Sequence, residues 1–327
     1  MKQPTFTFRP YQAGDEHAIQ AGFSEVFPTY RTLDTWYWIH QQNPDGARII
    51  CAWADNGDLA AHYACTVHTA TWNGTPVTVG FIRDVFSAPA YRAFSNGRRG
   101  IFVQTIEAFV QAWTGADKLV ALYGFPSERP FRLGKLFMRY QAFSDWHCYR
   151  YTVPTELQQH TPIGLINTPK RFEKAFDRLS ERRCKKYPFA INRTAAFLNW
   201  RFIDIPHKQY WIWAFSTFLS TEVLGYVIIA PNQPQAQLVD FYFPEEAQLA
   251  HSFWQQVTDI LRWRGIKTVE TCFAAACPEQ PRLQALGFKP QSRPNSIVPV
   301  FRSFHPDLET SWLDANFHYT MADSDLY

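Results

Sequence analysis

The stretch VFSAPAYRAFSNGRRGIF, residues 85–102, joins a strand-like run to an amphipathic helix and is the most specific local feature of the sequence. Gly97 and Gly100 stand just before that helix begins at Ile101. Glycine lets a backbone come close to a ligand, and the free N–H groups at a helix start attract anions. Three arginines add positive charge to the stretch: Arg92, Arg98 and Arg99. We therefore predict an anion site here, with a solvated surface turn as the alternative interpretation.

Alternating apolar runs before this stretch predict an antiparallel meander. Asn-Gly pairs separate the runs, and this pair is typical of a tight hairpin because both turn residues must reach positive φ. The runs cover residues 48–54, 59–72 and 76–87. A strand at 5–11 and two helices, one from Gly14 and one over 32–42, are expected before the meander. A helix over 101–115, a buried strand at 118–123 and a helix to about 139 are expected after the loop.

The second half of the chain repeats this order in outline. Strand-like runs at 209–216, 223–230 and 236–243 precede a helix over about 245–263, a strand at 267–273 and a short helix ending in Leu286-Gly287-Phe288. Order and period, with little residue identity, indicate a diverged tandem repeat of one α/β unit. We expect domains at 1–150 and 191–327, joined over 151–190 by a connector and a basic helix.

The order of elements resembles the GNAT superfamily of acyl-CoA-dependent N-acyltransferases. Residues 86–92 resemble its Val-x-Pro-x-Tyr-Arg-Gly approach to the pyrophosphate loop, and 97–102 resemble the loop end and helix start. Residues 123–127 resemble the Gly-Phe-Pro-Asn segment of a bacterial subgroup, and Asn199–Phe202 with Pro206 resembles the start of its second unit. Here the two glycines are three apart instead of two. The resemblance implies an α/β fold with a mixed sheet and two GNAT-like units in tandem, the second degenerate.

The resemblance also implies a co-substrate and the residues that hold it. Acetyl-CoA, or another acyl-CoA, is expected with its pyrophosphate at the loop and its pantetheine arm between the fourth and fifth strands. The expected contacts are Val85, Phe86, Arg92, Gly97, Arg98, Arg99, Gly100, Ile101, Gly124 and Phe125. No metal is expected.

Acyl transfer to an amine needs a group that removes a proton. Asp84, in the fourth strand, is the candidate base, with a strand-surface carboxylate paired to a cation as the equal alternative. Tyr123 is a weak candidate acid, because the helix after it places no tyrosine where the superfamily often has one. His62 and His68, on the neighbouring strand, are interpreted as ordinary polar strand residues.

Composition excludes several classes of protein. The chain has 327 residues, is 46% hydrophobic and carries a net charge of +3, which favours packed cores over a sequence-independent nucleic-acid binder. No Walker loop or Gly-x-Gly-x-x-Gly fingerprint is present. No long apolar run predicts a membrane span, and the first residues do not read as a signal peptide. The six cysteines form no Cys-x-x-Cys pair, so we expect reduced thiols and a cytoplasmic protein.

Three functions remain open at this point. The first is a cytoplasmic N-acyltransferase that moves an acyl group, expected to be acetyl, to a small-molecule amine. The second is a GNAT-like protein that binds acyl-CoA or a metabolite without turnover. The third is an aminoacyl-tRNA-dependent peptidyltransferase, against which the loop ending at Gly100 argues. The acceptor and the oligomeric state are not specified by the sequence.

Three further segments carry charge. In the second unit, Glu245 and Glu246 stand where a diphosphate would bind, so we expect no second CoA there. The basic helix over 170–187 is interpreted as solvated, and the alternative is that its basic face binds an anionic substrate or nucleic acid. The tail at 322–325 is either a solvated terminus or a segment that caps a cation or lines an acceptor site.

Overall fold

A computed structural model describes residues 4–94, 97, 100–157, 159–220, 222–275, 277–292 and 297–327. The chain forms two compact units, and each is discontinuous in sequence. The first unit comprises Met1–Ala70, Pro76–Phe143 and Asn295–Leu313. The second comprises Thr71–Thr75, Ser144–Pro294 and Asp314–Tyr327. The contiguous segments 1–150, 151–190 and 191–327 therefore do not coincide with these units.

The sheet of the first unit has the strand order β1-β2-β3-β4-β5-β15-β6. Its strands are β1 (Phe6–Pro10), β2 (Ala47–Ala54), β3 (Leu59–Trp72), β4 (Thr75–Ser87), β5 (Leu119–Gly124), β15 (Val300–Ser303) and β6 (Gln141–Ala142). β4 and β5 run parallel, as expected for strands joined by a helical crossover. The predicted meander and its hairpins are confirmed.

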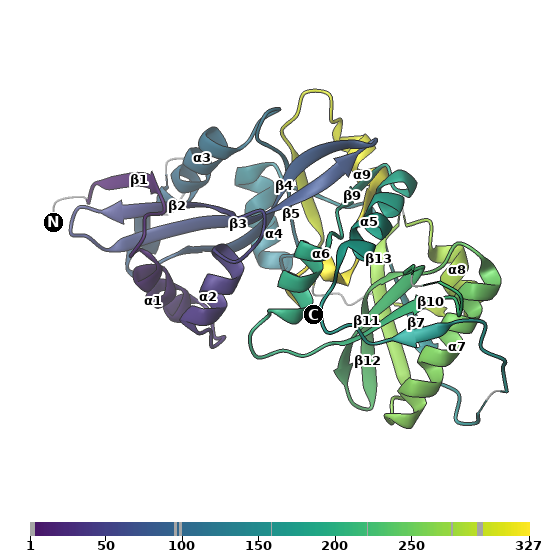
Figure 1. Ribbon diagram of the computed structural model, residues 1–327. Coiled ribbons are helices and arrows are strands. Elements are labelled where there is room, and N and C mark those ends of the chain that lie inside the picture. Colours follow the sequence, from purple (N-terminus) through teal and green to yellow (C-terminus); the bar gives the residue numbers. More distant parts are fainter. Residues whose placement is uncertain are drawn as a thin grey trace. The chain divides into compact units, whose positions relative to one another are not determined.

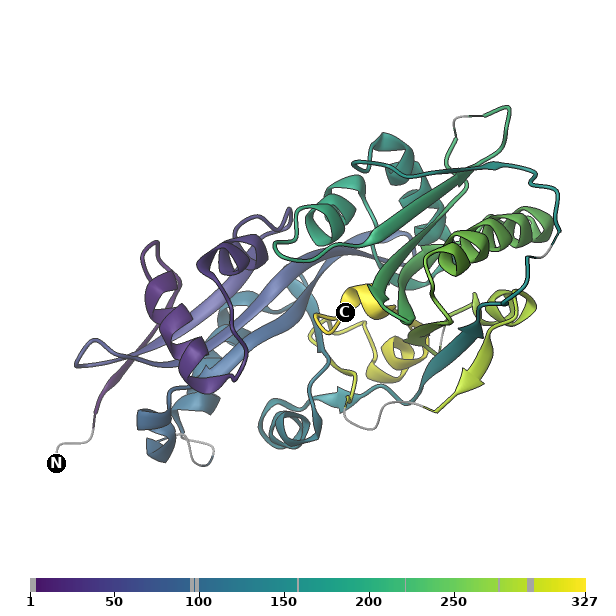
Figure 2. The same cartoon turned by 90° about the horizontal axis from the view of Figure 1, so that it is seen from below.

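Helices cover both faces of this sheet. Ile19, Trp36 and Phe86 share one apolar cluster, so α1 (Glu16–Val26) and α2 (Leu33–His40) pack on one face. Ile106 and Met138 share another, so α3 (Ile101–Trp113) and α4 (Glu128–Met138) pack on the other. Figure 1 shows α1 and α2 on one side of the strands and α3 on the other. In Figure 2, seen from below, α1 and α2 lie in front of the strands.

The second unit repeats this plan. Its sheet has the order β14-β7-β13-β12-β11-β10-β8, and β12 and β13 are its parallel pair. The strands are β14 (Lys289–Gln291), β7 (Trp146–Thr152), β13 (Thr268–Ala274), β12 (Gln235–Tyr242), β11 (Gly225–Asn232), β10 (Trp211–Ser216) and β8 (Leu165–Asn167). The helices are α5 (Lys174–Lys186), α6 (Ala195–Leu198), α7 (Ala247–Trp263), α8 (Gln280–Ala285) and α9 (Thr310–Asn316), of which α9 spans the boundary between the units. The short β9 (Phe189–Ile191) and β16 (Phe317–His318) pair in parallel. The α/β class with two GNAT-like units is confirmed, although β8 lies in the segment expected to be a connector.

The two sheets exchange strands along the chain. β7 follows the first unit in sequence but pairs with β13 of the second unit. β15 follows the second unit in sequence but pairs with β5 of the first, with Val300 opposite Gly124. The strand that directly follows the first unit's main segment thus belongs to the second sheet, and the strand that follows the second unit's main segment belongs to the first sheet.

A disulfide in the second unit corrects the prediction for the cysteines. Cys148 on β7 and Cys272 on β13 are opposite each other in an antiparallel pair, with their Cα atoms 4.2 Å apart, and they form a disulfide. They are 124 residues apart in sequence, so spacing could not reveal the pairing. The other four cysteines are free, as expected: Cys51, Cys65, Cys184 and Cys277.

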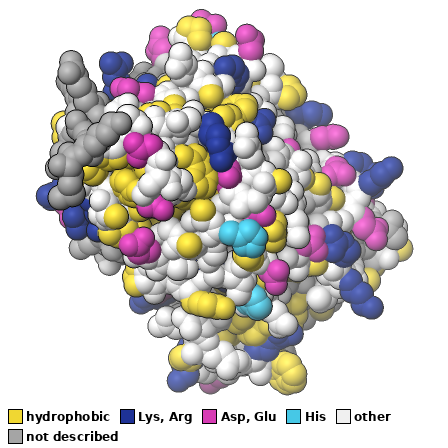
Figure 3. All heavy atoms as spheres, turned by 90° about the vertical axis from the view of Figure 1, so that its left-hand side faces the viewer, with side chains coloured by type: hydrophobic (Ala, Val, Ile, Leu, Met, Phe, Trp, Pro, Cys, Tyr) yellow, Lys and Arg dark blue, Asp and Glu magenta, His cyan; other side chains and the backbone are white. Residues whose placement is uncertain are grey.

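Charge is mixed on the face drawn in Figure 3, where Lys and Arg side chains lie among Asp and Glu. This agrees with the small net charge of +3. Among the described helices, none is long and apolar enough to cross a membrane.

Candidate functional site

The predicted anion site lies at the start of α3. The segment after β4 forms a 3-10 turn, η1 (Pro89–Phe94), in which Arg92 is exposed. The Tyr91 hydroxyl donates to Asp58 at 2.9 Å and ties this turn to the β2–β3 hairpin. Gly97 has a φ of +73°, and the Gly100 N–H donates to its carbonyl at 3.1 Å. Arg98 and Arg99 lie outside the described residues.

Gly100 is the N-cap of α3 and provides no side-chain cap for the first turn. No acidic residue stands in that turn. The N–H groups at this helix start can therefore bind an anion, and the helix dipole favours it. Ile101 itself is buried and anchors the helix in the core. The residues present fit the pyrophosphate of an acyl-CoA.

β4 and β5 part next to this site. Their pairing runs from Thr78 to Phe81, which lies opposite Tyr123, and the described residues of the two strands are not paired beyond this point. Three rings gather where pairing stops: Tyr123 stacks on Phe81 at 5.2 Å, and Phe125 meets both edge-on. Gly124 ends β5, and a Cβ there would contact Ile82 at 3.5 Å.

A bulge in β4 turns Asp84 toward α1 and α2. Ile82 and Val85 both pack in the cluster on the α3 and α4 side, whereas regular alternation would put them on opposite faces. Asp84 has a φ of +51°, which is the left-handed conformation of an inserted residue. Phe86 then packs on the α1 and α2 side. The extra residue thus places the Asp84 carboxylate on that face.

Asp84 is paired with two cations or potential cations. Its Oδ2 accepts hydrogen bonds from Arg31, in the loop between α1 and α2, and from His40 Nε2 at 2.8 Å. Burial alone would raise the pKa of Asp84, but the Arg31 charge and the His40 hydrogen bond lower it well below its usual range. A carboxylate held so firmly in its charged form is a weak base. The paired-carboxylate interpretation therefore describes Asp84 better than that of the base.

His62 also lies at Asp84, although the sequence suggested only an ordinary strand residue. Its side chain is fully buried, its ring stacks on Phe86 at 5.2 Å, and Nδ1 lies 2.5 Å from the Asp84 carbonyl oxygen. Burial lowers the pKa of His62 to about 4. No local spacing links His62, Arg31 and His40 to Asp84, so sequence reasoning missed this cluster. We call these four residues the Asp84 cluster.

The second unit contains a similar arrangement around Asp240, on its fourth strand β12. The register with β11 shifts beside Asp240, which leaves Val239 as the extra residue. Arg193, in the loop between α5 and α6, donates to Asp240 at 2.9 Å, and the Tyr226 hydroxyl on β11 donates at 2.8 Å. Each unit thus holds an aspartate at an irregularity of strand four, paired with an arginine from the loop between its first two helices.

Two predictions about charged segments of the second unit are settled by this core. Arg193 also binds Asp323 of the tail at 2.7 and 2.8 Å, so the tail caps a cation. Arg183 of the basic helix is 1% exposed and lies 3.6 Å from Asp240. The interpretation of this helix as solvated is therefore wrong for Arg183, which lies in the core of the second unit.

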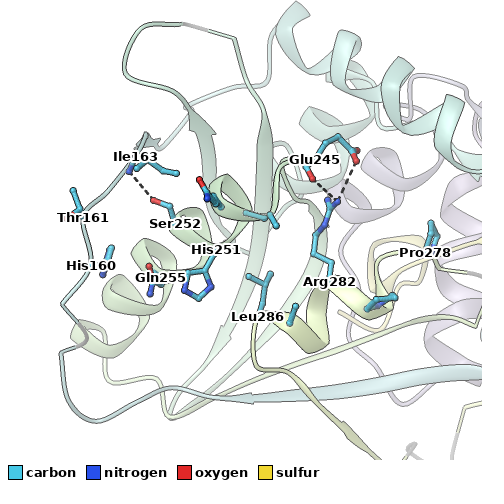
Figure 4. Close-up of a pocket in the computed structure, with 15 residues that line it drawn as sticks. His160, Thr161, Ile163, Glu245, His251, Ser252, Gln255, Pro278, Arg282 and Leu286 are labelled. Atoms are coloured by element: carbon cyan, nitrogen blue, oxygen red, sulfur yellow. Dashed lines mark hydrogen bonds and ion pairs between the residues drawn. The ribbon is translucent and has the colours of Figure 1, made fainter.

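The start of α7 is the second unit's counterpart of the anion site. A cavity of about 860 Å³ lies between α7, α8 and the segment near His160. Figure 4 shows His251 and Gln255 of α7 facing this space, with Glu245 bound to Arg282 of α8. Glu246 is the N-cap. The carboxylates of Glu245 and Glu246 thus stand at the start of α7, and the Arg282 guanidinium is already paired with Glu245.

Within the described part of the chain, no group of three or more His, Cys, Asp or Glu side chains could hold a metal ion.

The fold and the glycine loop can be compared with those of known proteins. Residues 7–133 match the acetyltransferase (GNAT) domain family. The match covers β1 through most of α4, which includes the parted strands, the anion site and the Asp84 cluster. No protein of curated function matches the chain in sequence.

Solved structures share the fold along nearly the whole chain. A probable N-acyltransferase from Enterococcus faecalis, of unknown function, is 12% identical; the match covers 96% of this chain and 74% of that one, with a TM-score of 0.68. A GCN5-related N-acetyltransferase from Anabaena variabilis is 12% identical over 92% and 73%, with a TM-score of 0.64. A tandem GNAT protein from the clavulanic acid pathway is 13% identical over 93% and 100%, with a TM-score of 0.53.

Proposed function

We propose that the chain transfers an acyl group, most simply acetyl, from CoA to the amine of a small molecule. The observation that supports this most directly is the start of α3, where Gly100 brings no side chain to cap the helix N–H groups. The parting of β4 and β5 beyond Phe81 offers a path for the pantetheine arm. Backbone groups near Val85 and Phe86 would then lie along the thioester, as the resemblance implies.

The acceptor is proposed to bind on the α1 and α2 side of these strands. The Asp84 cluster lies there, and Tyr123 lies beside Phe81 and Phe125 at the parting. Tyr123 keeps its role as the candidate acid, because a thiolate leaving from the parted strands would be close to it. We also propose a cytoplasmic location, because the proposed substrates, acetyl-CoA and a small amine, are both available there.

The test is transfer of label from radiolabelled acetyl-CoA to a panel of amino acids, amino sugars and polyamines. Acylated product at a rate well above the blank reaction supports the proposal. Tight binding of acetyl-CoA without product from any amine would favour the non-catalytic alternative. Failure to bind acetyl-CoA at all would overturn the donor as well.

A further inference from the structure

His40 and His62 of the Asp84 cluster each have one ring nitrogen that is buried and has no hydrogen-bond partner among the described residues. His40 Nε2 faces the Asp84 carboxylate and His62 Nδ1 faces the Asp84 carbonyl, and both of these oxygens can only accept. Both facing nitrogens must therefore carry hydrogen. In the neutral rings, His40 Nδ1 and His62 Nε2 hold the lone pairs, and both atoms are buried without a partner among the described residues.

We propose that His40 Nδ1 is the base that takes the proton of the acceptor amine, and that Asp84 is a positioning residue. This inference rests on the proposed acyl transfer and assigns the proton acceptor within it. Asp84 fixes the tautomer of His40 through Nε2 and leaves Nδ1 basic. Its negative charge also stabilises the imidazolium that forms when Nδ1 accepts a proton.

His40 is better placed for this role than His62. The carboxylate of Asp84 contacts His40, whereas His62 contacts only a carbonyl. The charged groups around His40 are Asp84, which favours the imidazolium, and Arg31 and Arg83, which oppose it. Burial lowers the pKa of His40 below its usual value, so the ring is neutral near pH 7 and Nδ1 keeps its lone pair. Its ring packs on Trp36 at 5.1 Å, which limits its rotation.

The second unit supplies an internal comparison. The partners of Asp240 are the guanidinium groups of Arg193 and Arg183 and the hydroxyls of Tyr226 and Thr320. Guanidinium and hydroxyl groups do not change their protonation state near pH 7. The aspartate of strand four thus contacts titratable imidazoles in the first unit. In the second unit it contacts groups that keep one protonation state near pH 7.

The proton and bond changes balance as follows. His40 Nδ1 takes a proton from the acceptor ammonium, and the freed amine forms a bond to the thioester carbon. The carbon–sulfur bond breaks and CoA leaves as a thiolate. The proton removed from the nitrogen during attack passes to solvent or to the thiolate. No oxidant, reductant or metal is needed.

The test is His40→Gln, because the glutamine amide can still donate to Asp84 where Nε2 did but offers no titratable nitrogen. We expect the transfer rate at saturating substrates to fall by about 100-fold or more. We also expect the rise of rate with pH, which reports the base, to disappear. Affinity for acetyl-CoA should stay within about twofold. His40→Asn is the second variant if His40→Gln folds poorly, with acetyl-CoA binding as the check on folding.

Two matched variants separate the base from its surroundings. His62→Gln should keep the pH inflection even if the rate falls, and Tyr226→Phe in the second unit should keep both rate and profile. A His40→Gln enzyme that retains the rate, or loses rate but retains the inflection, would overturn the assignment of His40 while leaving acyl transfer intact. If the wild-type protein transfers nothing, the proposed function fails first and this inference fails with it.

Discussion

Arg193 donates to Asp240 inside the second unit, and this pair repeats the one that Arg31 and Asp84 form in the first. Asp240 is fully buried and Arg193 is 1% exposed. Removing one partner of such a pair leaves an uncompensated charge in the core. The repeated pair has little sequence identity around it, so it reflects the demands of the fold at strand four.

Asp240→Asn should therefore destabilise the protein by about 3–5 kcal/mol. The Arg193 and Arg183 charges would remain buried with less compensation. Denaturant unfolding measures the change, and Asp307→Asn, at an exposed carboxylate, is the control with an expected effect below about 0.5 kcal/mol. Equal stability of the two variants would show that the buried pair does not hold the second unit.

Gly100→Asp should abolish acetyl-CoA binding in calorimetry while the fold is kept. The φ of −68° and ψ of 150° at Gly100 suit any N-cap residue, and aspartate is a favoured one. Its carboxylate would cap the α3 amides and repel the pyrophosphate. Gly100→Asn caps the helix without charge, so it should bind more tightly than Gly100→Asp. Wild-type affinity in a folded Gly100→Asp protein would remove the pyrophosphate from this site.

One acetyl-CoA should bind per chain. At the start of α7, Glu245 and Glu246 occupy the positions that the glycine loop opens in the first unit, and Glu245 also binds Arg282. A carboxylate at a helix start satisfies the dipole and repels phosphate. Calorimetric titration gives the stoichiometry. Two equivalent sites, or CoA found in the cavity beside α7, would contradict this prediction.

Stability should fall between pH 7 and pH 5 through His62. The pKa of His62 is lowered to about 4 by burial, against about 6.5 in the unfolded chain. Between these values the unfolded state binds the proton and the folded state does not, so stability rises with pH in this window. The loss from His62 alone should be roughly 2 kcal/mol at pH 5. His62→Gln should reduce the slope of unfolding free energy against pH. An unchanged slope would mean that the buried imidazole is not neutral.

Thiol titration of the denatured, unreduced protein should detect four cysteines, and six after reduction. The two additional thiols belong to Cys148 and Cys272. Replacing both by serine should cost about 2–5 kcal/mol in stability, because the bridge links residues far apart in sequence. Detection of six thiols before reduction would show that the pair is not oxidised under those conditions.

Local signals predicted most elements of both units. Thr32 caps α2 as expected, its hydroxyl accepting from the Thr35 N–H, and Asn73-Gly74 turns β3 into β4. Signals of this kind act within a few residues, so one sequence is enough to detect them. The short strands β8, β14 and β15 escaped detection because pairing with distant partners, not their own pattern, makes them strands.

The candidate site was predictable only in part. Gly100 and the α3 start form a local motif, and the structure has the geometry that the motif suggested. The Asp84 cluster gathers residues from α2, β3, β4 and the loop after α1, and no spacing rule relates them. The alternation of apolar and polar residues also could not predict that Asp84 faces α1 and α2, because the bulge at Asp84 shifts the alternation by one residue.

The placement of β15 has a consequence for synthesis on the ribosome. When β5 emerges, its outer edge has no neighbour until Val300 is made, after nearly all of the second unit. An open strand edge is prone to pair with other chains. The first unit therefore cannot complete its sheet in the order in which it is translated. During the interval before β15 is made, a chaperone or rapid translation would protect the nascent protein from aggregation.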